Sequence, residues 1–139
     1  MRCRLVGSEM CIRDRPMGER VQRRIAALKP GRYTRMGAAI RHCAEQLRQR
    51  HNRHRLLLVL SDGKPSDVDY YEGRYAIEDT RHAVLEARRS DMRVFGVTID
   101  QEAQGYISRL FGRGGYALVR RPDHLSQALP GIYRQILQH

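Results

Sequence analysis

Two oxygen-bearing side chains stand where an α/β protein can bind a ligand. Asp62 directly follows the apolar run RLLLVLS, and Thr34 lies in a loop before a segment of helical periodicity. In open α/β sheets, ligands gather beyond the carboxyl ends of the strands, which is where Asp62 would lie. Each residue also has a structural interpretation, because Asp-Gly is a common turn pair and threonine is a common helix N-cap. The two residues alone leave both interpretations open.

A second group of polar residues follows Asp62 in the segment DGKPSDVDYYEG. Its acids do not have the spacing of an EF-hand calcium loop, which favours a solvated loop or a surface that contacts a partner. Tyrosines that pack over the end of the strand are an equally good interpretation. The candidate partner-contact residues are Lys64, Asp67, Asp69, Tyr70, Tyr71 and Glu72.

Two further functions are compatible with the residues. Asp62 would serve as a nucleophile or phosphoacceptor of an enzyme if a second carboxylate lay near it, and Asp100 is the candidate. The excess of 26 Lys and Arg over 15 Asp and Glu would suit a nucleic-acid-binding module. Nearly all of this charge is arginine, however, as a high GC content of the coding DNA also produces. No aromatic residues interleave with the arginines to stack on bases.

The amino-terminal segment differs in origin from the rest. LVGSEMCIRDR, from Leu5 to Arg15, resembles the in-frame translation of a transposase-type sequencing adapter. We therefore expect residues 1–15 to be an artefactual segment and residues 16–139 to be a partial domain. Cys43 is then the one native cysteine, which excludes a disulfide framework and a cysteine zinc site. No apolar run approaches the roughly 20 residues that span a bilayer, so we expect a cytoplasmic protein.

The candidate residues must be positioned by alternating strands and helices. Arg55–Ser61 and Val94–Ile99 are continuous apolar runs, which predict strands buried on both faces of a parallel sheet. The intervening residues 75–89 predict a helix that buries Ile77, Val84 and Ala87. A strand, a helix and a strand in this order form a parallel crossover unit. The predicted fold class is therefore α/β.

Shorter elements complete the prediction. Helices are expected at residues 17–28, from Thr34 onward, at residues 101–110 and near the carboxyl end, and a short strand at 116–119. In the last helix Pro130 is expected to break or restart the helix, because proline lacks the backbone N–H.

Thr34 and Asp62 gain a specific interpretation from their combination. GRYTRMG before a helix, followed by LVLSDG at a strand end, resembles two of the three ligand loops of the von Willebrand factor A (VWA) domain. The resemblance implies a Rossmann-like, doubly wound sheet with a metal-ion-dependent adhesion site (MIDAS), in which Mg²⁺ binds hydroxyl and carboxylate oxygens. Thr34 would be the second-loop ligand and Asp62 the third-loop ligand. Such sites bind partners and are not catalytic.

The first ligand loop of the family, Asp-x-Ser-x-Ser, does not occur in this sequence. The resemblance therefore implies a truncated domain that lacks the central first strand and its neighbours, so that Mg²⁺ binding is expected of the complete domain and is doubtful for this chain. It also implies that Arg55–Ser61 has an exposed apolar edge, which is an expected aggregation site.

A longer resemblance covers most of the chain. RRIAALKPGRYTRMGAAIRH, LVLSDGKPSDVDYYEGRYAIEDTR and VFGVTIDQEAQGYISRLFGRGGYALV look like the carboxyl-terminal end of the NorD and CbbO family, and NorD is the more similar. The resemblance implies a non-enzymatic adaptor that works with a MoxR-type AAA+ ATPase. Its target would be nitric oxide reductase for a NorD type or Rubisco for a CbbO type.

Overall fold

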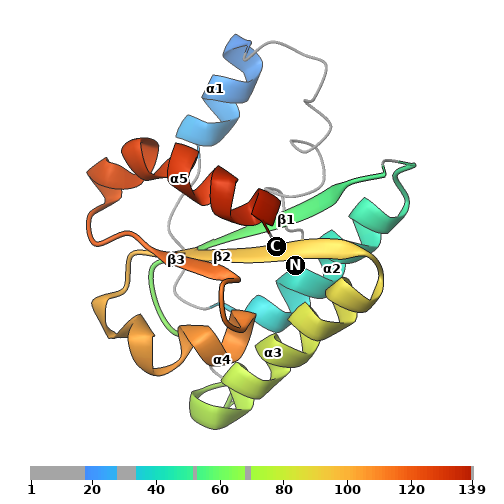
Figure 1. Ribbon diagram of the computed structural model, residues 1–139, viewed down its shortest axis with the longest axis vertical. Helices are drawn as coiled ribbons and strands as arrows, with labels where there is room; N and C mark the ends of the chain where they lie inside the picture. The colour runs from blue at the N-terminus through green and yellow to red at the C-terminus, as the bar shows by residue number, and fades with distance from the viewer. Residues whose placement is uncertain (1–17, 28–33, 52, 68–69, 139) are drawn as a thin grey trace. The chain divides into compact units, whose positions relative to one another are not determined.

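The computed structural model describes residues 18–27, 34–51, 53–67 and 70–138 (Figure 1). The chain divides into two compact units, Met1–Arg32 and Tyr33–His139. The first unit holds the helix α1 (Glu19–Ala26), where Arg23 Nη2 pairs with Glu19 Oε2 at 2.8 Å. A helix in this segment is thus confirmed. The adapter-like residues 1–15 lie outside the described residues, as do the side chains of Val21 and Ile25.

The second unit contains a three-stranded parallel sheet in the order β1 (Arg55–Ser61), β2 (Met92–Thr98), β3 (Tyr116–Leu118). The helix α3 (Gly73–Arg89) connects β1 to β2, so the predicted crossover unit is confirmed. The remaining helices are α2 (Met36–Arg48), α4 (Ile107–Phe111) and α5 (Leu125–Gln138), with short 3₁₀ turns at Gln101–Gly105 and Pro122–His124. The fold class is α/β, as predicted.

Helices cover both faces of this sheet. In Figure 1, α2, α3 and α4 lie on one side of the strands and α5 lies on the other. On the first side, Gly96 of β2 lets the ring of Phe111 approach so closely that a Cβ atom there would overlap it. On the second side, α5 places Ile132 and Ile136 against Phe95, Val97 and Val119. The sheet is therefore doubly wound.

The burial of the strands corrects one prediction. β2 is buried on both faces, but β1 is not: Leu57 is 5% exposed, whereas Leu58 is 37% and Leu60 is 60% exposed. Among the described residues β1 pairs with β2 alone, and the core under α5 consists of residues from β2, β3 and α5 and reaches β1 at the partly buried Leu56. The apolar composition of β1 predicted burial on both faces. A strand is buried on both faces, however, only where other elements pack against each face.

Two predictions about helices also change. The segment 101–110 is a 3₁₀ turn followed by a short α-helix, and α5 runs through Pro130 without a break. Pro130 is the sixth residue of α5 and is exposed, so its ring faces solvent there. Its ring removes one backbone N–H, the donor for the Ser126 carbonyl, and the helix continues through this single loss because the other donors remain.

Candidate site at the carboxyl edge of the sheet

Asp62 lies just beyond the carboxyl end of β1, as the sequence predicts, and it is exposed. The bend around it is closed by Ser61, whose hydroxyl donates to the Gly63 carbonyl at 2.7 Å and accepts from the Gly63 N–H at 3.3 Å. Ser61 therefore fixes the backbone of this loop, while the Asp62 carboxylate stays in solvent. The loop therefore fits both interpretations of Asp62, as part of a turn and as an accessible ligand.

Thr34 is exposed and does not cap α2. The N-cap residue is Arg35, and no side chain provides a capping hydrogen bond. Thr34 instead forms an isolated antiparallel bridge with Ser66, in which the Thr34 N–H donates to the Ser66 carbonyl at 2.7 Å. The next residue, Arg35, forms an ion pair with Asp67. These contacts place the Thr34 loop directly beside the loop that follows Asp62.

The candidate partner-contact residues divide into outward and inward ones. Lys64, Tyr70 and Glu72 are exposed, and Tyr70 reaches 90% exposure in a left-handed backbone conformation with φ of 57°. Tyr71 is only 6% exposed, so it is an internal residue and not a contact surface. Asp67 is mostly covered and is engaged by Arg35. Asp69 lies outside the described residues.

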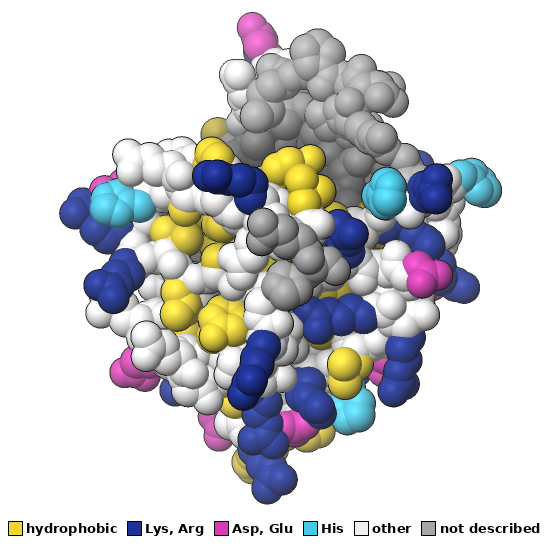
Figure 2. Space-filling model, in the orientation of Figure 1, with side chains coloured by type: hydrophobic (Ala, Val, Ile, Leu, Met, Phe, Trp, Pro, Cys, Tyr) yellow, Lys and Arg dark blue, Asp and Glu magenta, His cyan; other side chains and the backbone are white. Residues whose placement is uncertain are grey.

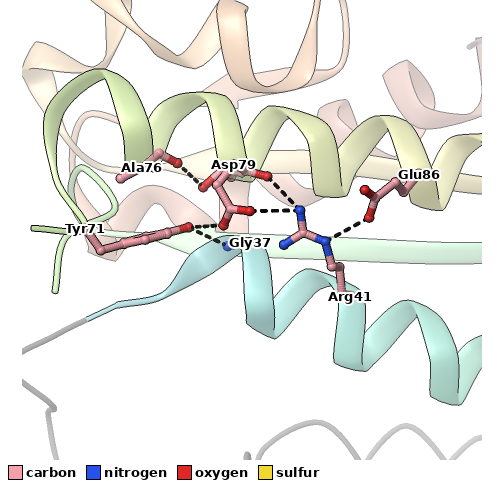
Figure 3. Close-up of polar contacts among 7 residues, drawn as sticks. Gly37, Arg41, Tyr71, Ala76, Asp79 and Glu86 are labelled. Atoms are coloured by element: carbon pink, nitrogen blue, oxygen red, sulfur yellow. Dashed lines mark hydrogen bonds and ion pairs between the residues drawn. The ribbon is translucent and has the colours of Figure 1, made fainter. Parts of the chain in front are cut away.

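Tyr71 belongs to a polar network between α2 and α3 (Figure 3). Its hydroxyl donates to Asp79 Oδ2 at 2.5 Å and accepts from the Gly37 N–H at 3.2 Å. Arg41 pairs with Asp79 Oδ1 at 2.8 Å and with Glu86 Oε2 at 2.8 Å. Sequence analysis missed this network, although a glycine inside a helical pattern, here Gly37, often signals a close approach.

The loop after β2 is occupied by its own contacts. Asp100 Oδ1 accepts from the Glu102 N–H at 2.9 Å, and Oδ2 accepts from the Tyr106 hydroxyl at 2.8 Å. Burial, and then the hydrogen bond to Asp100, raise the pKa of Tyr106 well above its usual range. Both carboxylate oxygens of Asp100 thus serve the local structure, which disfavours Asp100 as the second carboxylate of an enzyme that uses Asp62.

The arginines are distributed in a way that disfavours a nucleic-acid-binding module. Lys and Arg side chains are spread over the face seen in Figure 2, with Asp and Glu side chains between some of them. Several exposed arginines are paired with acids, as in Arg48–Glu45 at 2.9 Å and Arg121–Asp123 at 2.8 Å. Pairing reduces the local positive potential that would attract phosphates.

The described residues do not complete a magnesium site by themselves. Mg²⁺ demands near-octahedral coordination by oxygen, and Thr34 and Asp62 offer one hydroxyl and one carboxylate. Across the described ranges no three His, Cys, Asp or Glu side chains are grouped so that they could hold a metal ion. Thr34 and Asp62 therefore supply only part of the oxygen ligands that Mg²⁺ requires.

Most of the chain is similar in sequence to known proteins. Residues 12–128 match the model of the von Willebrand factor type A domain. Protein NorD of Brucella melitensis is 57% identical over 123 residues, which cover 88% of this chain and 19% of that protein. Protein NorD of Stutzerimonas stutzeri is 54% identical over 108 residues, or 78% of this chain and 18% of that protein.

A more distant relative is the uncharacterized protein YojO of Bacillus subtilis, 31% identical over 118 residues that cover 81% of this chain and 18% of YojO. The chain spans about a fifth of the length of these curated relatives. No solved structure matches it. Within the described part of the chain, none of the helices has the length and apolarity needed to cross a membrane.

Proposed function

Since this chain belongs to the von Willebrand factor type A domain family and is similar to NorD, we propose that it is a non-enzymatic protein-interaction domain of a NorD-like adaptor. One observation carries the proposal. The Thr34–Ser66 bridge holds the second-loop residue beside the Asp62 loop, and both candidate ligands, Thr34 and Asp62, are exposed there. Exposed oxygen ligands at a sheet edge suit a site that is completed by a partner.

The cofactor of the complete domain is Mg²⁺, with Thr34 and Asp62 among its ligands. The other ligands must come from residues outside this chain, because two oxygen ligands leave the coordination shell incomplete. A hard cation in this position accepts a carboxylate oxygen from a partner. By itself the chain binds Mg²⁺ weakly or not at all.

The partner surface comprises the exposed residues of the loop after β1. Lys64, Tyr70 and Glu72 are exposed in the segment that begins at Asp62, and Tyr75 at the start of α3 is 66% exposed. Tyrosines are enriched at the centres of protein interfaces, since they bury much area at a low entropic cost. In the cytoplasm the partner is a MoxR-type AAA+ ATPase, and the target is nitric oxide reductase. Rubisco is the alternative target.

The test uses the full-length protein that carries this sequence, with a purified MoxR-type ATPase as the binding partner. We expect Mg²⁺-dependent binding that EDTA abolishes and that Asp62→Ala weakens about tenfold or more, equivalent to about 1.4 kcal/mol. Asp91→Asn is the control and should bind normally, because the exposed Asp91 directly precedes β2 and therefore lies at the opposite, amino-terminal edge of the sheet. Binding that is indifferent to both EDTA and Asp62→Ala would refute the metal-dependent mode.

A further inference from the structure

One buried residue, Tyr71, contacts both loops of the candidate site. The Tyr71 hydroxyl accepts from the Gly37 N–H at the start of α2, close behind Thr34. The Tyr71 carbonyl accepts from the Asp67 N–H at 2.8 Å, within the loop that begins at Asp62. The guanidinium of Arg35 also lies 5.9 Å from the centre of the Tyr71 ring. Tyr71 therefore connects the Thr34 loop with the Asp62 loop through its backbone and its side chain.

The approach of Tyr71 to α2 depends on the absence of a side chain at Gly37. A Cβ atom there would overlap the Asp79 carboxylate and touch the Tyr71 hydroxyl. Any larger residue would therefore push apart the start of α2 and the Tyr71–Asp79 pair. Gly37 therefore has a specific geometric function in the first turn of α2, because only a residue without a side chain fits there.

Asp79 is held in place so that it can accept from Tyr71 (Figure 3). Burial raises the pKa of Asp79, but the hydrogen bonds from Arg41 and Tyr71 outweigh this effect and leave the pKa below its ordinary value. The carboxylate is thus ionised at neutral pH. Arg41, which Glu86 holds from the opposite side, fixes its orientation. The acceptor of the Tyr71 hydroxyl is therefore preorganised by α2 and α3.

We propose that Tyr71 is a positioning residue whose hydroxyl fixes the Thr34 loop against the Asp62 loop. Its role in partner binding rests on the function proposed above, but its effect on the two loops does not. The hydroxyl forms hydrogen bonds with one N–H and one carboxylate, and it contributes little to the packing of the apolar core around it. Removing it loosens the loops and leaves the sheet intact.

The test is hydrogen–deuterium exchange of the full-length protein without added metal, comparing the wild type with Tyr71→Phe. A lost hydrogen bond of ordinary strength corresponds to about a tenfold change in an opening equilibrium. We expect exchange about tenfold faster in peptides that cover Thr34 to Ile40, with no change in β2 and β3. Tyr106→Phe is the matched control, because Tyr106 is also buried and donates to a carboxylate. It should leave the Thr34 peptides unchanged.

Two substitutions of Asp79 separate positioning from general packing. Asp79→Asn keeps an oxygen acceptor for the Tyr71 hydroxyl, so exchange near Thr34 should stay within about threefold of the wild type. Asp79→Ala removes the acceptor and should behave like Tyr71→Phe. The proposal is overturned if Asn and Ala have equal effects, if Tyr71→Phe leaves the Thr34 peptides unchanged, or if exchange rises equally throughout the domain. If the wild type fails to bind its ATPase partner while the exchange pattern is as expected, only the proposed function fails.

Discussion

The two faces of the sheet differ in how completely they are covered. On the face of α2, α3 and α4, residues from all three helices are buried against the strands, and Leu57 of β1 is buried with them. On the α5 face, Phe95 and Val97 of β2 are buried, but Leu58 and Leu60 of β1 remain exposed. Leucines of one strand thus lie in opposite environments. The difference shows that the position of the covering helices, and not residue type, decides burial here.

The exposed leucines lie on a strand with one paired neighbour among the described residues. β1 pairs in register with β2, with Leu58 opposite Phe95 and Leu60 opposite Val97. The other edge of β1 has no partner strand in the part of the chain that the structure describes. An apolar, seven-residue edge of this kind is a template for pairing with another chain. The covered face stabilises the fold, and the edge of β1 without a described partner strand is the expected surface for association.

The largest expected effect is on the covered face. Phe111 is fully buried and packs its ring against the backbone of Gly96. Phe111→Ala should lower the free energy of unfolding by about 3–5 kcal/mol, because it removes a buried ring and leaves a cavity. Urea denaturation measures this loss. Leu118→Ala, at a partly exposed position on β3, is the control and should cost less than half as much. Equal losses would mean that the two environments do not differ as described.

A matched pair on β1 tests the comparison directly. Leu57→Ala removes a buried leucine and should cost about 2–5 kcal/mol of unfolding free energy. Leu60→Ala makes the same chemical change at a position that is 60% exposed, so it should stay within about 0.5 kcal/mol of the wild type. The difference between the two denaturation midpoints is the quantity to measure. A Leu60→Ala loss as large as that of Leu57→Ala would show that the α5 face is closed over β1.

The sequence predicted the crossover of β1, α3 and β2 well, because apolar runs and helical periodicity are local signals. It could not predict the exposure of Leu58 and Leu60, since that depends on where α5 packs and on how many strands flank β1. Pro130 was misjudged for a related reason. Proline disfavours a helix interior, but it removes one backbone donor alone, and the packing of Ile132 and Ile136 into the core holds α5 on beyond it.

The candidate site shows the same division between local and distant signals. The pattern LVLSDG correctly predicted that Asp62 lies at a strand end. The resemblance to the VWA domain predicted that the Thr34 loop lies beside the Asp62 loop. The contacts that hold the loops together join residues far apart in the sequence, such as Tyr71 with Gly37. One-dimensional spacing does not encode such pairs. The inward orientation of Tyr71 beside the outward Tyr70 could not be read from a Tyr-Tyr pair either.

The smallest effect on stability should accompany a large effect on association. Leu60→Lys places a charge on the exposed face of the β1 edge, where lysine opposes strand pairing between chains. The free energy of unfolding should change by less than about 0.5 kcal/mol, because the side chain is already mostly in solvent. Light scattering of the chain during concentration should then show less aggregation than for the wild type. Leu118→Lys on the three-residue strand β3 is the control, and its benefit should be smaller because a short edge offers few pairing groups. If both variants aggregate like the wild type, the open edge of β1 is not the surface that causes association, and the contrast between the two faces concerns stability alone.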